Sequence, residues 1–389
     1  MVNRRVLRIK AVKNLYAYES CKLANHDLVI DKIQSDFAQD LNSMEPYDAP
    51  TMKKLTEEST SYFKAFFQNN PLPKEISTEA KISGDNAIQL FKTRNKEDFN
   101  KIKKDLARDF DQIREVQALV WKLIKEFSLQ NRRKVMEKVD MSEKFGQQVS
   151  ATMPFYNNTA LKKILETPEV EDALTREKAS WANDEDKVWD WYKSIIRKDS
   201  YFENYLKNPN PTEDEDFQAL DECIRRLIFK NDVIETFFDE KDINWNENKQ
   251  IVRSLVLKTL KSVNEPEGIV YPPLSYNWEE DLEYYQDLYS ETIKNNDYYE
   301  DLIEKKVKNW KMERLASLDR VILKTAICEM ITFTSIPVKV SINEFIEISK
   351  TYSTPKSKKF VNGLLDAISE ELINSGEIKK SGRGLIDSK

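Results

Sequence analysis

The chain has 389 residues, of which 33 % are charged, 40 % are hydrophobic and 7 are glycine, with a formal net charge of −6 at pH 7. The negative charge excludes a protein that coats nucleic acid with its whole surface, and the length allows two or three domains. Consecutive strands need turn glycines, so the glycine depletion favours an all-α protein.

Neither a membrane span nor a secretory signal is predicted. No apolar run approaches the ~18 residues that a membrane helix needs, and arginines interrupt any N-terminal apolar region. The 3 cysteines are isolated and odd in number. We therefore expect reduced thiols, no membrane partner and a cytoplasmic location.

The first predicted helix lies in Asn3 to Glu19, where apolar residues recur at every fourth position. Arg4 continues this apolar line and Arg8 lies close to it. A buried stripe does not normally continue into arginines. We therefore expect the helix start to project beyond the packed body, or to fray, and to leave its arginines free. The segment 1–13 has five basic residues and no acidic one, a footprint typical of phosphate binding.

The middle of the chain is also predicted to be helical. Residues 52–67 and 97–138 have helical periodicity, and in the second range an apolar stripe repeats at three-and-four spacing from Phe99 to Phe127. Prolines break up the segment 141–182. Residues 230–259 resemble 295–325, with identical spacing from Asp232 to Trp245 and from Asp297 to Trp310. This likeness indicates either a degenerate internal repeat or a chance similarity of two polar helices. A Pro/Gly-bearing linker is predicted at 263–275.

Three consecutive helices are predicted between Asn309 and Ile368. The first ends before Ile336-Pro337, because proline disfavours helix at the preceding residue. The second opens at Ser341, with Glu344 completing a capping box. The third follows Thr354, with Pro355 at its first helical position. The segment 350–365 is basic and contains no acidic residue; its cations are Lys350, Lys356, Lys358 and Lys359.

Residue types that carry catalysis are sparse. The single histidine, His26, is placed in a loop and has no histidine partner for a metal. No cysteine pair has CxxC spacing, and no glycine-rich phosphate loop occurs. We therefore expect no enzyme activity, no catalytic residue, no metal and no cofactor, and interpret the chain as a binding protein.

The C-terminal motifs LDRVIL, EM, IPVKVSINEFIEISK and KFVNGLLD, in this order, resemble the C-terminal half of the NusB family of bacterial transcription antitermination factors. The segment NRRVLRIKAVKNLYAYE is similar to the family's arginine-rich first helix. The resemblance covers roughly the first 40 and the last 110 residues and leaves about 220 between them. It implies an all-α fold: a NusB-like helical bundle with an additional helical domain inserted after the first helix region.

The expected organisation follows from this resemblance. It comprises an N-terminal arginine-rich helix and a following helix (1–40) that pack with the C-terminal domain, a helical insertion (41–262), the linker (263–275), the NusB-like C-terminal domain (276–377) and a basic flexible tail (378–389). The possible repeat at 230–259 lies inside the insertion. A truncated NusB-like module at the C-terminus is the alternative.

The resemblance also implies partners. Members of the family bind boxA-like single-stranded RNA together with NusE, a small-subunit ribosomal protein, and join the antitermination complex of RNA polymerase. Matched by position, the RNA-binding residues are Arg4, Arg5, Arg8, Lys10, Tyr16, Lys356, Lys358 and Lys359. The partner-binding residues are Tyr16, Asp319, Phe360 and Asn362.

Individual roles differ within this set. Guanidinium groups suit phosphates and base edges, and Tyr16 either stacks on a base or packs in the core. Asp319 aligns with an acidic position at the binding edge. Phe360 is expected to be partly core, and Gly363 to let a neighbouring helix approach.

Two other function classes are open. One is a helical protein-interaction scaffold that retains the fold without RNA binding, which has no need of two acid-free basic segments. The other is a ribosomal RNA methyltransferase with a NusB-like domain. It requires a doubly wound domain and a glycine-rich loop that the sequence does not show.

Overall fold

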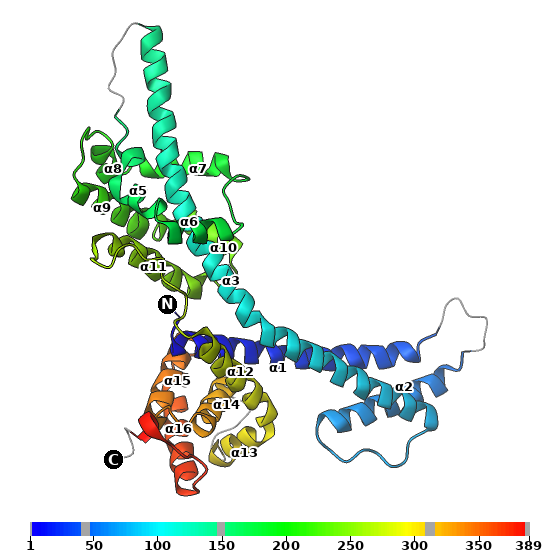
Figure 1. The fold of residues 1–389 in the computed structure, drawn as a ribbon. Helices are drawn as coiled ribbons and strands as arrows, with labels where there is room; N and C mark the ends of the chain where they lie inside the picture. Colours follow the sequence, from blue (N-terminus) through cyan, green and yellow to red (C-terminus); the bar gives the residue numbers. More distant parts are fainter. Residues whose placement is uncertain (1, 40–46, 146–151, 308–315, 386–389) are drawn as a thin grey trace. The chain divides into compact units, whose positions relative to one another are not determined.

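The computed structural model describes residues 2–39, 47–145, 152–307 and 316–385. Within these ranges every regular element is helical, which confirms the predicted all-α class (Figure 1). Contacts divide the chain into two compact units. Unit 1 comprises Met1–Asn3 and Ala107–Trp278, and unit 2 comprises Arg4–Leu106 and Glu279–Lys389. These bounds differ from those of the predicted insertion, linker and terminal domain, whose assignment stays a prediction.

Unit 2 is built around α14, in which every residue from Val321 to Met330 is buried. Helices α1, α13, α15 and α16 all contact it. The helices of this unit are α1 (Arg4–Asp36), α2 (Ala49–Phe67), the first part of α3 (Thr78–Lys144), α12 (Trp278–Lys294), α13 (Asn296–Val307), α14 (Ser317–Thr332), α15 (Val338–Tyr352) and α16 (Ser357–Asn374). Helix α1 therefore packs with α14 and α15, two of the three helices that follow each other at the C-terminal end of the sequence.

The C-terminal half of α1 joins a second apolar cluster in unit 2. Val29 and Ile33 pack there against Phe63 of α2 and Phe91 of α3. His26 lies in this part of α1, with its ring centroid 4.3 Å from that of Phe67. The predicted loop at His26 is therefore wrong: 1–40 holds one continuous helix through Asp36 rather than two.

Unit 1 packs short helices against the second part of α3. They are α4 (Pro154–Asn157), α5 (Thr159–Leu165), α6 (Pro168–Arg176), α7 (Glu185–Trp191), α8 (Ser200–Tyr205), α9 (Glu213–Glu222), α10 (Asp232–Lys241) and α11 (Trp245–Lys261), with π-helical turns at Tyr192–Ile196 and Cys223–Ile228. The predicted stripe of α3 is confirmed, since Phe110, Ile113 and Phe127 are fully buried. Aromatic contacts such as Trp181 on Phe237, 5.0 Å between centroids, fill the rest of this core.

Two predicted helix starts in unit 2 are wrong. Helix α15 begins at Val338, directly after Pro337, so Ser341 is a buried residue inside the helix and forms no capping box. Helix α16 begins at Ser357, two residues after Pro355. In both places the proline and the nearby hydroxyl groups correctly indicate that a helix starts there. They do not determine which residue is its first.

The segment after α16 is not the free tail that the sequence predicts. Lys380 Nζ donates to the carbonyl oxygen of Phe333 at 2.9 Å, and the backbone N–H of Ser381 donates to that of Thr334 at 3.0 Å. A 3₁₀ turn follows at Gly382–Leu385. The segment is docked on the C-terminal end of α14. The possible internal repeat matches Trp245 to Trp310. Because Trp310 lies outside the described residues, the repeat stays a prediction.

Candidate nucleic-acid interface

The first two arginines of α1 form ion pairs at the surface of unit 2. Arg5 donates two hydrogen bonds to Glu344 of α15, at 2.8 Å and 2.7 Å, and its side chain is 51 % exposed. Arg4 pairs with Glu280 of α12 and lies 4.2 Å from the centroid of the Tyr284 ring. Both guanidinium groups are accessible, and both are already partnered by carboxylates.

Arg8 lies in the interior of the unit. It is 3 % exposed, and its Nε lies 2.7 Å from Glu329 Oε1, on the fully buried side of α14. The Tyr284 hydroxyl donates to the same oxygen, and burial together with the Glu329 charge raises the pKa of Tyr284. The expectation of a projecting or frayed helix start is therefore wrong, and Lys10 is buried as well. Arg8 lies on the buried side of α1 because the buried carboxylate of Glu329, which faces it, needs a cation beside it.

Tyr16 is 41 % exposed, which contradicts the core alternative. It lines a groove of about 830 Å³ between α1, α13 and α14, hereafter the Tyr16 groove. Charges of both signs line this groove. Lys324 there bonds Glu19 at 3.0 Å and Asn296 at 2.7 Å, while Asp297 and Glu304 add negative charge.

Asp319 does not lie at an accessible edge. It is 4 % exposed and accepts a hydrogen bond from the Ser357 hydroxyl at 2.6 Å. Ser357 is the first residue of α16, and its hydroxyl also meets that of Thr354 at 2.8 Å. Asp319 therefore fixes the start of α16 on α14, and its predicted role in partner contact is revised to a positioning role.

The start of α16 carries the most exposed basic cluster among the predicted site residues. Lys356, Lys358 and Lys359 are all exposed. Lys358 and Lys359 line a groove of about 460 Å³ together with residues of α15. We call this surface the lysine groove, defined by Asn343, Ile346, Glu347, Lys358, Lys359 and Asn362.

Arg5 belongs to the same side of α15. Its pKa is raised mainly by the hydrogen bonds that Arg5 donates to Glu344 and by the charge of that carboxylate, with a smaller effect of Glu347, a residue of the lysine groove. The structure thus brings together Lys358, Lys359 and Asn362 in the lysine groove, while Arg5 binds Glu344, the neighbour in sequence of the groove residue Asn343.

Of two further residues of α16, one has the surroundings that the sequence predicts and the other does not. Phe360 is half-buried, in agreement with a partly core position. Gly363 is exposed, and a Cβ placed on it would meet nothing within 4 Å, so no neighbouring helix requires the glycine. Asn362 donates to Asp366 of its own helix at 3.1 Å.

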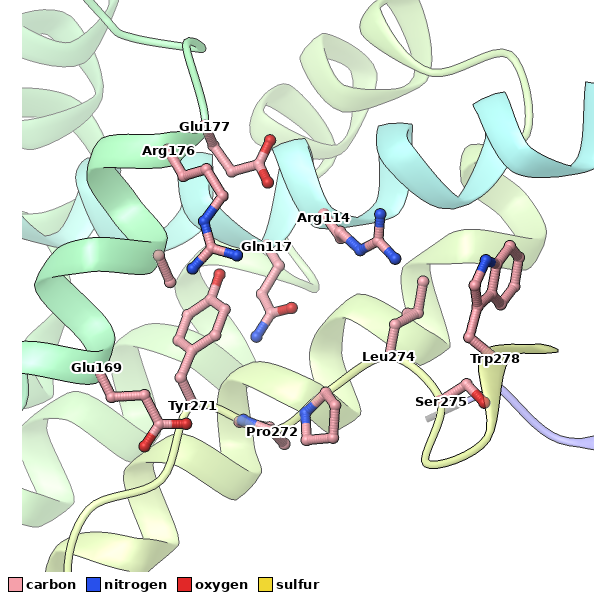
Figure 2. Close-up of a pocket in the computed structure, with 12 residues that line it drawn as sticks. Arg114, Gln117, Glu169, Arg176, Glu177, Tyr271, Pro272, Leu274, Ser275 and Trp278 are labelled. Atoms are coloured by element: carbon pink, nitrogen blue, oxygen red, sulfur yellow. The ribbon is translucent and has the colours of Figure 1, made fainter.

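A cavity of about 500 Å³ in unit 1 involves no residue that the sequence predicts to be functional (Figure 2). Gln117 is 2 % exposed, and neither its Nε2 nor the Tyr271 hydroxyl has a hydrogen-bond partner within the described ranges. Burial, followed by the charge of Glu177, raises the pKa of Tyr271, while Arg176 on the same wall opposes the shift. Arginines and glutamates balance in this lining, so its charge selects no ligand class.

In the part of the chain that the structure describes, no group of three or more His, Cys, Asp or Glu side chains is arranged to hold a metal ion. None of the helices in that part is long and apolar enough to cross a membrane.

Comparison with known proteins gives a consistent result. The model of the NusB family matches residues 250–370. The transcription antitermination protein NusB of Salinibacter ruber is 37 % identical over 147 residues, which are 36 % of this chain and 91 % of that protein. No solved structure matches the chain.

Two further relatives carry the same name. That of Chloroherpeton thalassium is 46 % identical over 100 residues, 26 % of this chain and 47 % of that protein. That of Dictyoglomus turgidum is 39 % identical over 122 residues, 31 % of this chain and 74 % of that protein. In each case most of this chain lies outside the matched part.

Proposed function

Because this chain belongs to the NusB family, we propose that it is a transcription antitermination factor that binds boxA-like single-stranded RNA together with NusE. NusE is the small-subunit ribosomal protein that acts with the family, and the assembly would act on RNA polymerase. No enzymatic step is part of this function. The matched part of the chain lies mostly in unit 2, so that is where we place the RNA and partner contacts.

The observation that carries the proposal is the charge at the start of α16. Its first turn contains no acidic residue and is surrounded by Lys356, Lys358 and Lys359. The N-terminus of a helix already has a positive electrostatic potential, so lysines there oppose helix stability. The same arrangement favours a bound anion, because the lysines add to that potential. This combination supports phosphate binding better than it supports a structural role.

The lysine groove also offers groups that recognise more than charge. Asn343 and Asn362 line it from two helices, and amide side chains both donate to and accept from base edges. Unpaired RNA exposes these edges together with its phosphates. Arg5 adds a planar guanidinium next to α15, although a phosphate must compete there with Glu344.

The protein partner fits the Tyr16 groove better. Tyr16 provides an exposed aromatic ring, and the lining of that groove has four carboxylates against three cations, a small excess of negative charge. Ribosomal proteins are rich in basic residues, which complement such a surface. We therefore assign Tyr16 to NusE rather than to RNA. We also propose that Phe360 contacts the partner through the exposed part of its ring.

The test is a fluorescence-anisotropy titration of a labelled boxA-like RNA, with and without purified NusE, at several salt concentrations. We expect tight, salt-sensitive binding that NusE enhances. In Lys358→Gln/Lys359→Gln, the slope of log K against log salt should fall in magnitude by about 1.4, since a single-stranded contact contributes about 0.7.

A matched control is available in the same unit. Lys53 and Lys54 are an adjacent, exposed pair near the start of α2, so Lys53→Gln/Lys54→Gln makes the same change of charge away from the groove. The control should bind as the wild type does. Absence of RNA binding under all conditions would favour the alternative, a scaffold that keeps the NusB fold without RNA binding.

A further inference from the structure

One face of α11 in unit 1 is unusually basic for a protein with a net negative charge. The residues along this face, together with Arg225 from the preceding π-helical turn, line a groove of about 320 Å³. We call it the α11 groove, defined by Arg225, Gln250, Arg253, Ser254, Lys258 and Lys261. Its lining contains four cations and no carboxylate.

Helical geometry explains why these residues share a face. From Gln250 to Lys261 they follow each other at intervals of three, one, four and three positions, and such intervals lie on one side of an α-helix. The opposite side of α11 is apolar and buried, with Ile251, Val252, Leu255 and Leu260 in the core of unit 1. The helix is therefore held in place by one face and presents the basic face to solvent.

Two cations of the groove form no ion pair with a carboxylate in the described part of unit 1. Arg225 is bonded to Asp221 at 2.7 Å, so its charge is partly balanced. Arg253 and Lys261 have no such ion pair there, and Arg253 Nε is a buried donor without an acceptor. A buried donor that lacks an acceptor is costly, and an anion in the groove would satisfy it.

Helix stability alone does not account for the arrangement. Lys258 and Lys261 lie in the last turn of α11, where cations interact favourably with the helix dipole. Arg253 lies in the middle of the helix, and Arg225 comes from another element. Their convergence on the same groove points to a ligand with more than one negative charge.

We propose that the α11 groove binds the phosphodiester backbone of single-stranded RNA. From Arg253 to Lys261 the cations span about 12 Å, at about 1.5 Å per residue. This length suits a polymer with repeated charges better than one free phosphate. The groove has no aromatic side chain on which a base would stack, so the contact is independent of RNA sequence. The proposal rests on the proposed function in taking RNA as the physiological ligand.

The experiment compares two labelled RNAs on the full-length chain, a 20-nucleotide oligouridine and a short boxA-like RNA. In Arg253→Gln/Lys261→Gln the affinity for oligouridine should fall at least about fivefold at 0.1 M salt, with a salt slope reduced by about 1.4. Lys138→Gln/Lys178→Gln, which changes two exposed lysines of unit 1 outside the groove, should leave both unchanged.

A second variant makes the test independent of any loss of folding. Gln250 is exposed and lines the groove, so Gln250→Lys adds a cation there. Its affinity for oligouridine should rise severalfold, with a slope steeper by about 0.7. Unchanged oligouridine binding in both groove variants would overturn the proposal. So would displacement of oligouridine by a few millimolar inorganic phosphate at constant ionic strength, which would assign the groove to free phosphate.

Failure of this inference is distinguishable from failure of the proposed function. If boxA-like RNA binds and is sensitive only to Lys358 and Lys359, while oligouridine does not bind, the α11 groove is no RNA site and the proposed function stands. If oligouridine binds through the α11 groove and boxA-like RNA gains nothing from its sequence or from NusE, the groove is an RNA site and the antitermination proposal fails.

Discussion

At the scale of single residues, the main finding is that Arg8 is held by a buried carboxylate. Its partner Glu329 is fully buried on α14, and Tyr284 donates to the same oxygen. Because removal of one member leaves a buried charge unpaired, Arg8→Met should lower the free energy of unfolding by about 3–5 kcal/mol. Urea denaturation of the full-length chain measures this loss.

The double variant Arg8→Met/Glu329→Gln should recover most of that stability, since it removes both charges. Arg5→Met is the matched control: its pair with Glu344 is exposed, so a loss below about 1 kcal/mol is expected. A stable Arg8→Met variant with a reduced salt slope for RNA would instead place Arg8 in direct contact with phosphate.

Sequence periodicity could not predict this pairing. The apolar stripe of the first helix shows that Arg4 and Arg8 are close to the buried side, but it does not show what they meet. Glu329 is 321 positions away, and in the sequence it is one carboxylate among 67 acidic residues. The usable signal was an acidic residue on an otherwise apolar face of the 317–332 helix, which requires a cation from elsewhere.

Two of the glycines in the C-terminal part of the chain, Gly363 and Gly384, should respond to substitution in opposite ways. Gly363 lies in the exposed interior of α16 with open space around it, so Gly363→Ala should stabilise the protein by about 1 kcal/mol. At Gly384 a Cβ would lie 2.1 Å from the carbonyl oxygen of Thr334. Gly384→Ala should therefore destabilise by about 1–3 kcal/mol. Thermal and urea unfolding test both, and equal effects would refute the assigned surroundings.

At the scale of elements, helices were predictable where one apolar stripe runs through them, whereas their ends were not. The stripe of α3 is correct from Ile102 to Phe127, yet the helix extends from Thr78 to Lys144 because polar flanking turns continue it without a breaker. The start of α15 follows Pro337, and Ser341 is fully buried inside the helix. Local capping rules do not take such burial into account.

The docking of the C-terminal segment on α14 should depend on pH through Lys380. Its ammonium group donates to the Phe333 carbonyl, and burial lowers its pKa to about 8, with a small opposing effect of Glu329. Below pH 8 the lysine is charged in both states, and the folded state bears the cost of its burial. Between pH 8 and about 10.4 the unfolded chain binds more protons, so stability rises with pH.

The measurement is the free energy of unfolding of wild type and Lys380→Met at pH 7, 8, 9 and 10. The wild type should gain stability relative to the variant over this range. Tyr298, whose pKa is raised to about 12 by burial and then by Glu377, has the opposite effect above pH 10, but it is present in both proteins and cancels. A difference that is constant with pH would show that Lys380 is solvated in the folded state.

At the scale of the whole molecule, the family resemblance predicted more than periodicity did. It predicted an all-α fold and a large additional helical region, because the motifs of the N-terminal and C-terminal parts are separated by about 220 residues. The bounds of the two units were beyond prediction. The division falls inside α3, at Leu106 and Ala107, where the sequence shows one uninterrupted stripe.

The two basic surfaces belong to different units and share no lining residue. Independent sites have additive effects on free energy. Combining Lys358→Gln/Lys359→Gln with Arg253→Gln/Lys261→Gln should therefore reduce the salt slope for a long RNA that contains a boxA-like sequence by about 2.8, the sum of both pairs. The measurement is the same anisotropy titration, with each pair alone as reference. The combined variant could instead reduce the slope no more than one pair does. In that case a given RNA uses only one of the two surfaces, and the α11 groove binds RNA molecules other than the one held by unit 2.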